Sequence, residues 1–147
     1  MSIKKQLRFF NSKNGILNLE VNGLCYYSKY NPDRDIEKFL LPQLNSSKKR
    51  YIIFGLGLGY HAQKLLQLDS KEIVVFENDI SLLQEVNKRV DLKQLFNSPR
   101  LKLITEWQNL KLSDVEDQII ILPTWYKTLD DMQMKEVFQS IIINRNT

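Results

Sequence analysis

The 147-residue sequence has a single cysteine, Cys25, and a single histidine, His61. One cysteine excludes an intramolecular disulfide and a cysteine-rich zinc site, and it is typical of a protein of the reducing cytoplasm. The histidine has no second base or nucleophile spaced to work with it, so we predict no catalytic residue and no metal site. The cytoplasm is the location that these absences favour.

Long hydrophobic runs are missing as well. No window approaches the roughly 18 apolar residues that a membrane span needs, and residues 1–5 lead into no signal-peptide core. The formal net charge is only +4, from 21 basic and 17 acidic residues, and the longest basic run is Lys48-Lys49-Arg50. Because no apolar window is long enough, we expect no membrane span. A solvated loop explains the basic run, so we expect no nucleic-acid partner.

Two Asn-Gly pairs divide the first 31 residues into short segments. Asn14-Gly15 and Asn22-Gly23 flank an alternating apolar stretch, and each pair favours a two-residue turn with both central residues at positive φ. We therefore expect a small antiparallel β-meander in residues 1–31, with strands at residues 7–10, 16–21 and 24–27.

From residue 32 onward, helices and strands alternate. Pro32 and the two aspartates near it predict a helix start. Short apolar segments predict parallel strands covered on both faces, at residues 51–55, 73–77, 101–104 and 118–122. A last helix is expected from the apolar stripe Met134, Val137, Phe138 and Ile141. The predicted fold class is α/β, with a Rossmann-like, mostly parallel sheet flanked by helices in residues 32–147.

Three alternating glycines follow the first parallel strand. Gly55, Gly57 and Gly59 form a G-x-G-x-G loop, and Glu77 stands at the tip of the next strand. Glycines let a backbone approach a ligand closely, and a carboxylate at that strand tip can accept both hydroxyls of a ribose. Tyr60 stands where a dinucleotide loop would have its third glycine, and the P-loop pattern is absent. The pattern predicts a small adenosine- or nucleotide-like ligand.

Three residues beside these positions are further candidate contacts. Tyr60 and His61 begin the helix after the loop, and Asn78 follows the acid. A helix N-terminus lowers the pKa of a histidine, so we expect His61 to be neutral, with a packing or anion-contacting role.

The G-x-G-x-G spacing with an acid closing the second strand resembles the S-adenosylmethionine loop of class I methyltransferases and of spermidine-synthase-like aminopropyltransferases. The resemblance implies that the glycines pack against the amino-acid end of the cofactor and that Glu77 holds its ribose. It also implies an acid after the third strand that contacts the adenine amine. Glu106 stands at that position, beside Trp107, whose face could stack on a purine; an exposed loop acid beside a half-buried tryptophan is the alternative.

Departures from that pattern argue against a complete methyltransferase. Ile53 stands two positions before the first glycine, where those families have an acid. Leu122 precedes Pro123 where amino-directed methyltransferases have a polar residue. Only four parallel strands fit the sequence, fewer than a full core of that class has. We therefore expect a partial module, a fragment of a longer protein.

A second resemblance covers residues 14–90. The segment Ser28-Lys29-Tyr30-Asn31-Pro32 and the loop Gly55-Leu56-Gly57-Leu58-Gly59-Tyr60-His61 are together similar to the N-terminal region of the bacterial motility accessory factor family. These are large glycosyltransferase-like proteins linked to flagellin glycosylation with nonulosonic acids, and they have aspartate and proline where this chain has Asn31 and Asn78. Their transferase chemistry is attributed to a C-terminal domain, so the resemblance implies an accessory domain with a catalytic partner domain.

The segment Ser28-Lys29-Tyr30 also has two interpretations of its own. Its hydroxyl, ammonium and phenol groups could bind a phosphate or carboxylate group of a ligand. Alternatively, the segment could be a cap and turn before the helix.

Three functional hypotheses follow, and they leave open whether the chain is an enzyme. The first is an accessory Rossmann-like domain of a motility-accessory-factor-like protein that binds a nucleotide or nucleotide sugar. The second is a relative of S-adenosylmethionine-dependent methyltransferases or aminopropyltransferases. The third is a non-catalytic interaction module whose glycine loop is a relic.

Overall fold

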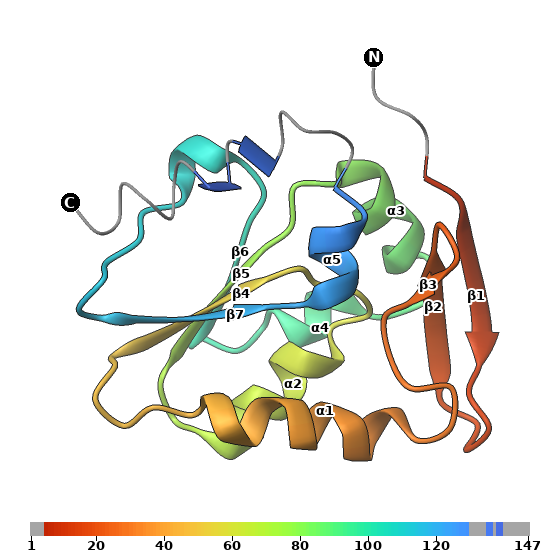
Figure 1. The fold of residues 1–147 in the computed structure, drawn as a ribbon, viewed down its shortest axis with the longest axis horizontal. Helices are drawn as coiled ribbons and strands as arrows, with labels where there is room; N and C mark the ends of the chain where they lie inside the picture. The colour runs from red at the N-terminus through yellow and green to blue at the C-terminus, as the bar shows by residue number, and fades with distance from the viewer. Residues whose placement is uncertain (1–4, 130–134, 137, 140–147) are drawn as a thin grey trace.

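The computed structural model, which describes residues 5–129, 135–136 and 138–139, contains an antiparallel sheet and a parallel sheet flanked by helices (Figure 1). The antiparallel strands are β1 (Leu7–Asn11), β2 (Leu17–Val21) and β3 (Leu24–Cys25). The parallel strands are β4 (Arg50–Phe54), β5 (Glu72–Phe76), β6 (Leu101–Ile104) and β7 (Asp117–Ile121), in the order β6-β5-β4-β7. The predicted α/β class, with a meander before a parallel sheet, is confirmed.

The helices connect these strands. They are α1 (Pro32–Leu40), α2 (Tyr60–Leu68), α3 (Ile80–Asn87), α4 (Leu92–Leu95) and α5 (Pro123–Lys127), with 3-10 turns η1 (Leu41–Gln43) and η2 (Trp107–Asn109). Neither α4 nor α5 was predicted, because a helix of about one turn is too short to show an apolar periodicity. Among the described residues, no helix is long and apolar enough to cross a membrane.

The turns of the meander differ from each other. Asn22 and Gly23 both have positive φ, 51° and 84°, as predicted for a two-residue hairpin turn. At the first turn only Gly15 has positive φ, so the same prediction is wrong there. The reason is a longer loop, closed by the Ser12 N–H, which donates to the Ile16 carbonyl at 2.8 Å.

The third strand is shorter than predicted. It ends at Cys25, although the Tyr26 N–H still donates to the Leu19 carbonyl of β2 at 2.8 Å, and Tyr27 leaves the ladder. The buried amide of Asn18 donates to the carbonyls of Tyr27 and Ser28, at 3.2 and 3.0 Å. These carbonyls therefore bond to a side chain rather than to a neighbouring strand, and the two tyrosine rings are free to turn into the protein.

The four parallel strands end in one row. Phe54, the last residue of β4, pairs with Phe76 of β5 and Ile121 of β7, and Phe76 pairs with Ile104 of β6. Each predicted strand lies within one residue of the observed one, because runs buried on both faces stand out in the sequence. The row brings the loops after all four strands to one edge of the sheet.

The meander lies at this carboxyl edge of the parallel sheet (Figure 1). Three side-chain contacts join the N-terminal segment to loops beyond the strand ends: Tyr60 Oη to the Leu17 carbonyl at 2.7 Å, Thr124 Oγ1 to the Cys25 carbonyl at 2.7 Å, and Lys5 Nζ to Asp79 Oδ2 at 2.9 Å. The predicted division at residue 31 coincides with Asn31, whose side chain caps α1, and it stays a prediction.

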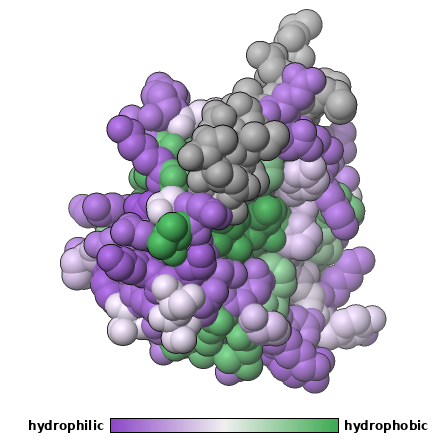
Figure 2. Space-filling view, turned by 60° about the vertical axis from the view of Figure 1, so that its left-hand side comes forward, coloured by the Kyte–Doolittle hydropathy of each residue, from purple (hydrophilic) through white to green (hydrophobic). Residues whose placement is uncertain are grey.

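Two aromatic residues complete the core behind the sheet. Trp125 is 2% exposed and packs on Phe54, with ring centroids 5.3 Å apart. Phe138 contacts both rings, at 4.8 Å from Phe54 and 5.4 Å from Trp125. The other three positions of the predicted last stripe, Met134, Val137 and Ile141, lie outside the described residues. On the outside, the face seen in Figure 2 is mostly hydrophilic, with hydrophobic surface in small separate areas.

A substitution at Gly55 tests how closely Trp125 packs against the glycine loop. Gly55 has φ +108°, and a Cβ there would lie 2.6 Å from the Cβ of Trp125. Gly23 has φ +84° with nothing within 4 Å of its would-be Cβ, so it is the matched control. Gly23→Ala is expected to lower the free energy of unfolding by about 1–2 kcal/mol through its backbone alone. Gly55→Ala is expected to lose about 1–3 kcal/mol more through overpacking.

Urea unfolding of both variants measures this difference. Equal losses for the two variants would show that Trp125 does not pack tightly against the loop.

Candidate functional site

The glycine loop and Glu77 lie together, as their positions after adjacent strands predict. The Gly55 N–H donates to the Phe76 carbonyl at 2.8 Å, which continues the pairing of β4 and β5 into the loop. Glu77 Oε1 accepts from the Leu56 N–H at 3.1 Å, and Oε2 accepts from the Asp79 N–H at 3.2 Å. Two backbone donors therefore fix the carboxyl group beside the glycine loop.

The Glu77 carboxyl group is buried, and this changes its acidity. Glu77 is only 1% exposed. Burial raises the pKa of Glu77 to about 7, whereas the two backbone hydrogen bonds and the charge of Lys5 oppose the rise and the charge of Asp79 adds to it. Near neutral pH the group is therefore divided between its protonated and ionised forms.

Two tyrosines from the meander cover the middle of the loop. Tyr27 Oη accepts from the Leu58 N–H at 2.7 Å. A Cβ on Gly57 would lie 2.5 Å from Tyr27 Oη and 2.8 Å from Cδ1 of Tyr26. Glycine at position 57 is therefore required by the tyrosines themselves.

The packing gives the glycines a structural reason as well. A Cβ on any of the three would collide with a side chain of the chain itself: Trp125 at Gly55, the tyrosine pair at Gly57, and Leu95 at Gly59. That the glycines also leave room for a ligand stays a prediction. The tyrosine pair was not recognised as part of the site, because strand alternation placed both residues inside the meander.

His61 lies in an aromatic cluster rather than in an open crevice. Its ring stacks on Tyr27 with centroids 5.5 Å apart, and Phe39 meets it edge-on at 5.3 Å. Burial lowers the pKa of His61 to about 4, so the ring is neutral as predicted, although burial and not the helix start is the cause. Its Nδ1 has no hydrogen-bond partner among the described residues.

The candidates after the other strands have different surroundings. Glu106 is exposed after β6. The ring of Trp107 packs on Phe76 at 4.4 Å, and its buried Nε1 has no hydrogen-bond partner within the described ranges. Asn78 Oδ1 accepts from Trp125 Nε1 at 3.1 Å. Asn78 therefore holds a core tryptophan, whereas the buried Trp107 donor is not satisfied by any residue that the structure describes.

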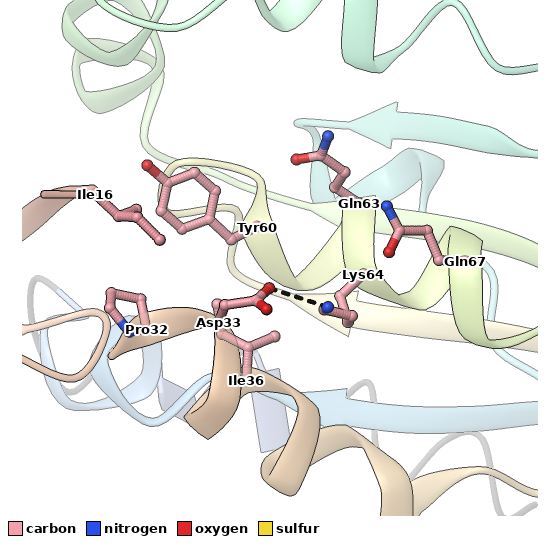
Figure 3. A pocket seen from close by; sticks show the side chains of 8 residues that line it. All are labelled: Ile16, Pro32, Asp33, Ile36, Tyr60, Gln63, Lys64 and Gln67. Carbon is pink, nitrogen blue, oxygen red and sulfur yellow. Dashed lines mark ion pairs between the residues drawn. The ribbon is translucent and has the colours of Figure 1, made fainter. Parts of the chain in front are cut away.

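Two cavities flank α2. The first, of about 250 Å³, lies between α1, α2 and Ile16, and an ion pair of 3.0 Å between Asp33 and Lys64 crosses from one helix to the other (Figure 3). The second, of about 410 Å³, is lined by Gly59 and Tyr60 on the loop side and by the segment around α4 on the other. Neither of these two cavities is lined by Glu77. In the described part of the chain, no cluster of three or more potential metal ligands is found.

Comparisons with known proteins identify the fold. No family model matches the sequence, and no curated protein matches it. The spermidine synthase of Thermotoga maritima superposes with a TM-score of 0.63 at 21% identity, over 84% of this chain and 45% of that one. A spermidine synthase solved with the transition state analogue AdoDATO gives a TM-score of 0.61 at 21% identity, over 82% and 45%.

The chain thus spans about 45% of the length of these solved structures. At this identity the likeness shows the fold, a Rossmann-like sheet of the type found in spermidine synthases.

The burial of Glu77 predicts a pH dependence of stability. Its pKa rises from 4.5 in the unfolded chain to about 7 in the folded one, so the folded state holds the extra proton between these values. The protonated Glu77 side chain is compatible with burial, so with respect to this group the folded state is most stable at low pH. The free energy of unfolding then falls as the pH rises from 4.5 to 7. At about 1.4 kcal/mol per pKa unit, the loss is about 3 kcal/mol.

Urea unfolding of the wild type and Glu77→Gln between pH 5 and 8 isolates this contribution. Relative to the wild type, the variant should gain about 2.5 kcal/mol over this range, because part of the loss has already occurred at pH 5, whatever the loss of one acceptor costs it at every pH. Glu72→Gln, at the exposed start of the same strand, is the control. Parallel pH profiles for the wild type and Glu77→Gln would contradict the shifted pKa.

Proposed function

We propose that the chain is a nucleoside-binding module in which Glu77 receives the ribose of an adenosine-like ligand. The observation that carries this proposal is the position of the Glu77 carboxyl group, which the Leu56 and Asp79 N–H groups fix beside the glycine loop at the carboxyl edge of the sheet. In doubly wound sheets a ligand binds at this edge, and an acid after the second strand bonds the ribose hydroxyls. A protonated or ionised carboxyl group can accept from at least one of these hydroxyls.

Trp107 supports a base-binding position next to this ribose site. Its ring lies against Phe76, the residue before Glu77, and its Nε1 is a buried donor without a partner among the described residues. Buried donors are rarely left unsatisfied, so a ligand acceptor such as a purine nitrogen would complete this position. The exposed carboxylate of Glu106 is close in sequence and suits an exocyclic amine.

The ligand class is an adenosyl compound of the kind used by aminopropyltransferases and methyltransferases. Structures with this fold include a spermidine synthase solved with AdoDATO, and this supports an adenosine-like ligand. Ile53 and Leu122 are fully or almost fully buried, where the resemblance has polar groups that handle the rest of the cofactor and its target. We therefore propose binding as the function of this chain, with any transfer chemistry supplied by another domain.

Entry of a ligand requires movement. Glu77 is almost fully buried, and the tyrosine pair packs on the loop beside it. A ribose reaches the carboxyl group only after some of the covering side chains have shifted, so binding is coupled to a local rearrangement.

A second candidate is the accessory domain of a motility-accessory-factor-like protein. One cluster favours it: Tyr27, directly before the Ser28–Pro32 segment, stacks on His61 and packs at a tilt against Tyr60, so the start of one motif of that resemblance lies close to the other. Ser28 Oγ accepts from the N–H groups of Tyr30 and Asn31, so this segment forms a turn and cap. A CMP-sugar is the ligand that would support this candidate.

Ligand-induced thermal stabilisation tests the proposal. S-adenosylmethionine, adenosine, ATP and a CMP-sugar are each added to the wild type, and at about 100 times its dissociation constant a binding ligand raises the melting temperature by roughly 5 °C or more. We expect this shift with an adenosyl compound, and we expect Glu77→Ala to abolish it while Glu72→Ala, at the opposite end of β5, retains it.

A shift that persists in Glu77→Ala would place the ligand elsewhere. Stabilisation by the CMP-sugar alone would favour the second candidate over the first.

A further inference from the structure

We propose that Tyr27 occupies the phosphate position of the glycine loop, so that the site selects nucleosides and excludes nucleotides that carry a phosphate at the 5′ carbon. This inference rests on the proposed nucleoside-binding function and adds the class of ligand that the site accepts.

The hydroxyl group of Tyr27 lies at the place where such loops hold an anion. Its oxygen accepts from the Leu58 N–H at 2.7 Å, next to the Gly59 N–H, which donates to the Leu56 carbonyl at 2.9 Å. These groups stand at the beginning of α2, whose N-cap is Gly59. Backbone N–H groups between a glycine-rich turn and a helix start are the donors that bind phosphate in nucleotide-binding proteins.

The ring that delivers this hydroxyl is held on several sides. It packs at a tilt against Tyr60 and stacks on His61, with centroids 4.7 and 5.5 Å away, and the residue is 6% exposed. The Tyr27 carbonyl accepts from the buried amide of Asn18 at 3.2 Å. Displacing the hydroxyl therefore means disturbing both the aromatic cluster and the end of the meander.

The loop also lacks a cation that could compensate a phosphate. Residues 55–63 contain no lysine or arginine, and burial keeps His61 neutral. Lys64, the first cation along α2, is paired with Asp33 at 3.0 Å. A phosphate entering here would meet an occupied donor at Leu58 and no free positive charge on the loop or on α2, whereas an uncharged 5′ group would need neither.

The neighbouring tyrosine supplies a matched control. Tyr26 approaches Gly57 through ring carbon Cδ1, and within the described residues its hydroxyl forms no hydrogen bond with the loop. Tyr26→Phe therefore removes a hydroxyl from the same buried layer without freeing a loop donor. Tyr27→Phe removes the oxygen that accepts from the Leu58 N–H.

Calorimetric titration with adenosine and ADP tests the selection, since the two probes share base and ribose and differ in the 5′ group. The wild type should bind adenosine at least about tenfold more tightly than ADP, a difference of about 1.4 kcal/mol. Tyr27→Phe should reduce this preference by about tenfold, because the freed Leu58 N–H can donate to a phosphate oxygen, and Tyr26→Phe should leave it unchanged. Equal or tighter binding of ADP by the wild type would overturn the inference.

Inorganic pyrophosphate separates this inference from the proposed function. If the wild type binds neither nucleoside nor nucleotide, nucleoside binding fails as the function, and the role of Tyr27 is decided by pyrophosphate alone. Pyrophosphate should raise the melting temperature of Tyr27→Phe, or of Tyr27→Ala, which removes the whole ring, and should leave that of the wild type and Tyr26→Phe unchanged. Stabilisation of neither Tyr27 variant, or equal stabilisation of the wild type, would show that the loop is not an anion site that Tyr27 fills.

Discussion

The contact of Tyr27 with the glycine loop joins the two sheets of the molecule. Its hydroxyl satisfies the loop donor at Leu58, its ring lies in the cluster at the start of α2, and its carbonyl is held by Asn18 from the meander. The meander is fixed to the carboxyl edge of the parallel sheet through this residue more than through any exposed ion pair, since solvated pairs contribute little. Gly57 must be glycine for the same reason.

Burial keeps the interior of this edge close to electrically neutral. The pKa shifts of Glu77, His61 and Tyr27 all favour the uncharged form, and in each case loss of contact with water is the main cause. The ion pair of Lys5 with Asp79 stands at the rim. Such an interior suits the sugar and base of a nucleoside better than a multiply charged group.

The sequence predicted the elements that follow simple periodicities, and it missed those that depend on distant partners. Parallel strands were found within one residue because their apolar runs are covered on both faces, and adjacency of β4 and β5 was enough to place Glu77 beside the glycines. The departure of Tyr27 from the third strand depends on a buried amide that no local pattern reveals. The neighbours of Gly55 and Gly59, Trp125 and Leu95, come from segments far along the chain.

The strand order also determines when each edge of β4 can pair during synthesis. β4 stands between β5 and β7, yet its residue Arg50 pairs with Asp117, 67 residues later. During synthesis, β4 can pair with β5 soon after both have left the ribosome, but its second edge stays open until β7 has followed. An apolar strand with an open edge is prone to pair with other chains. A nascent chain of this protein therefore passes through a long interval in which a holding chaperone would protect its central strand.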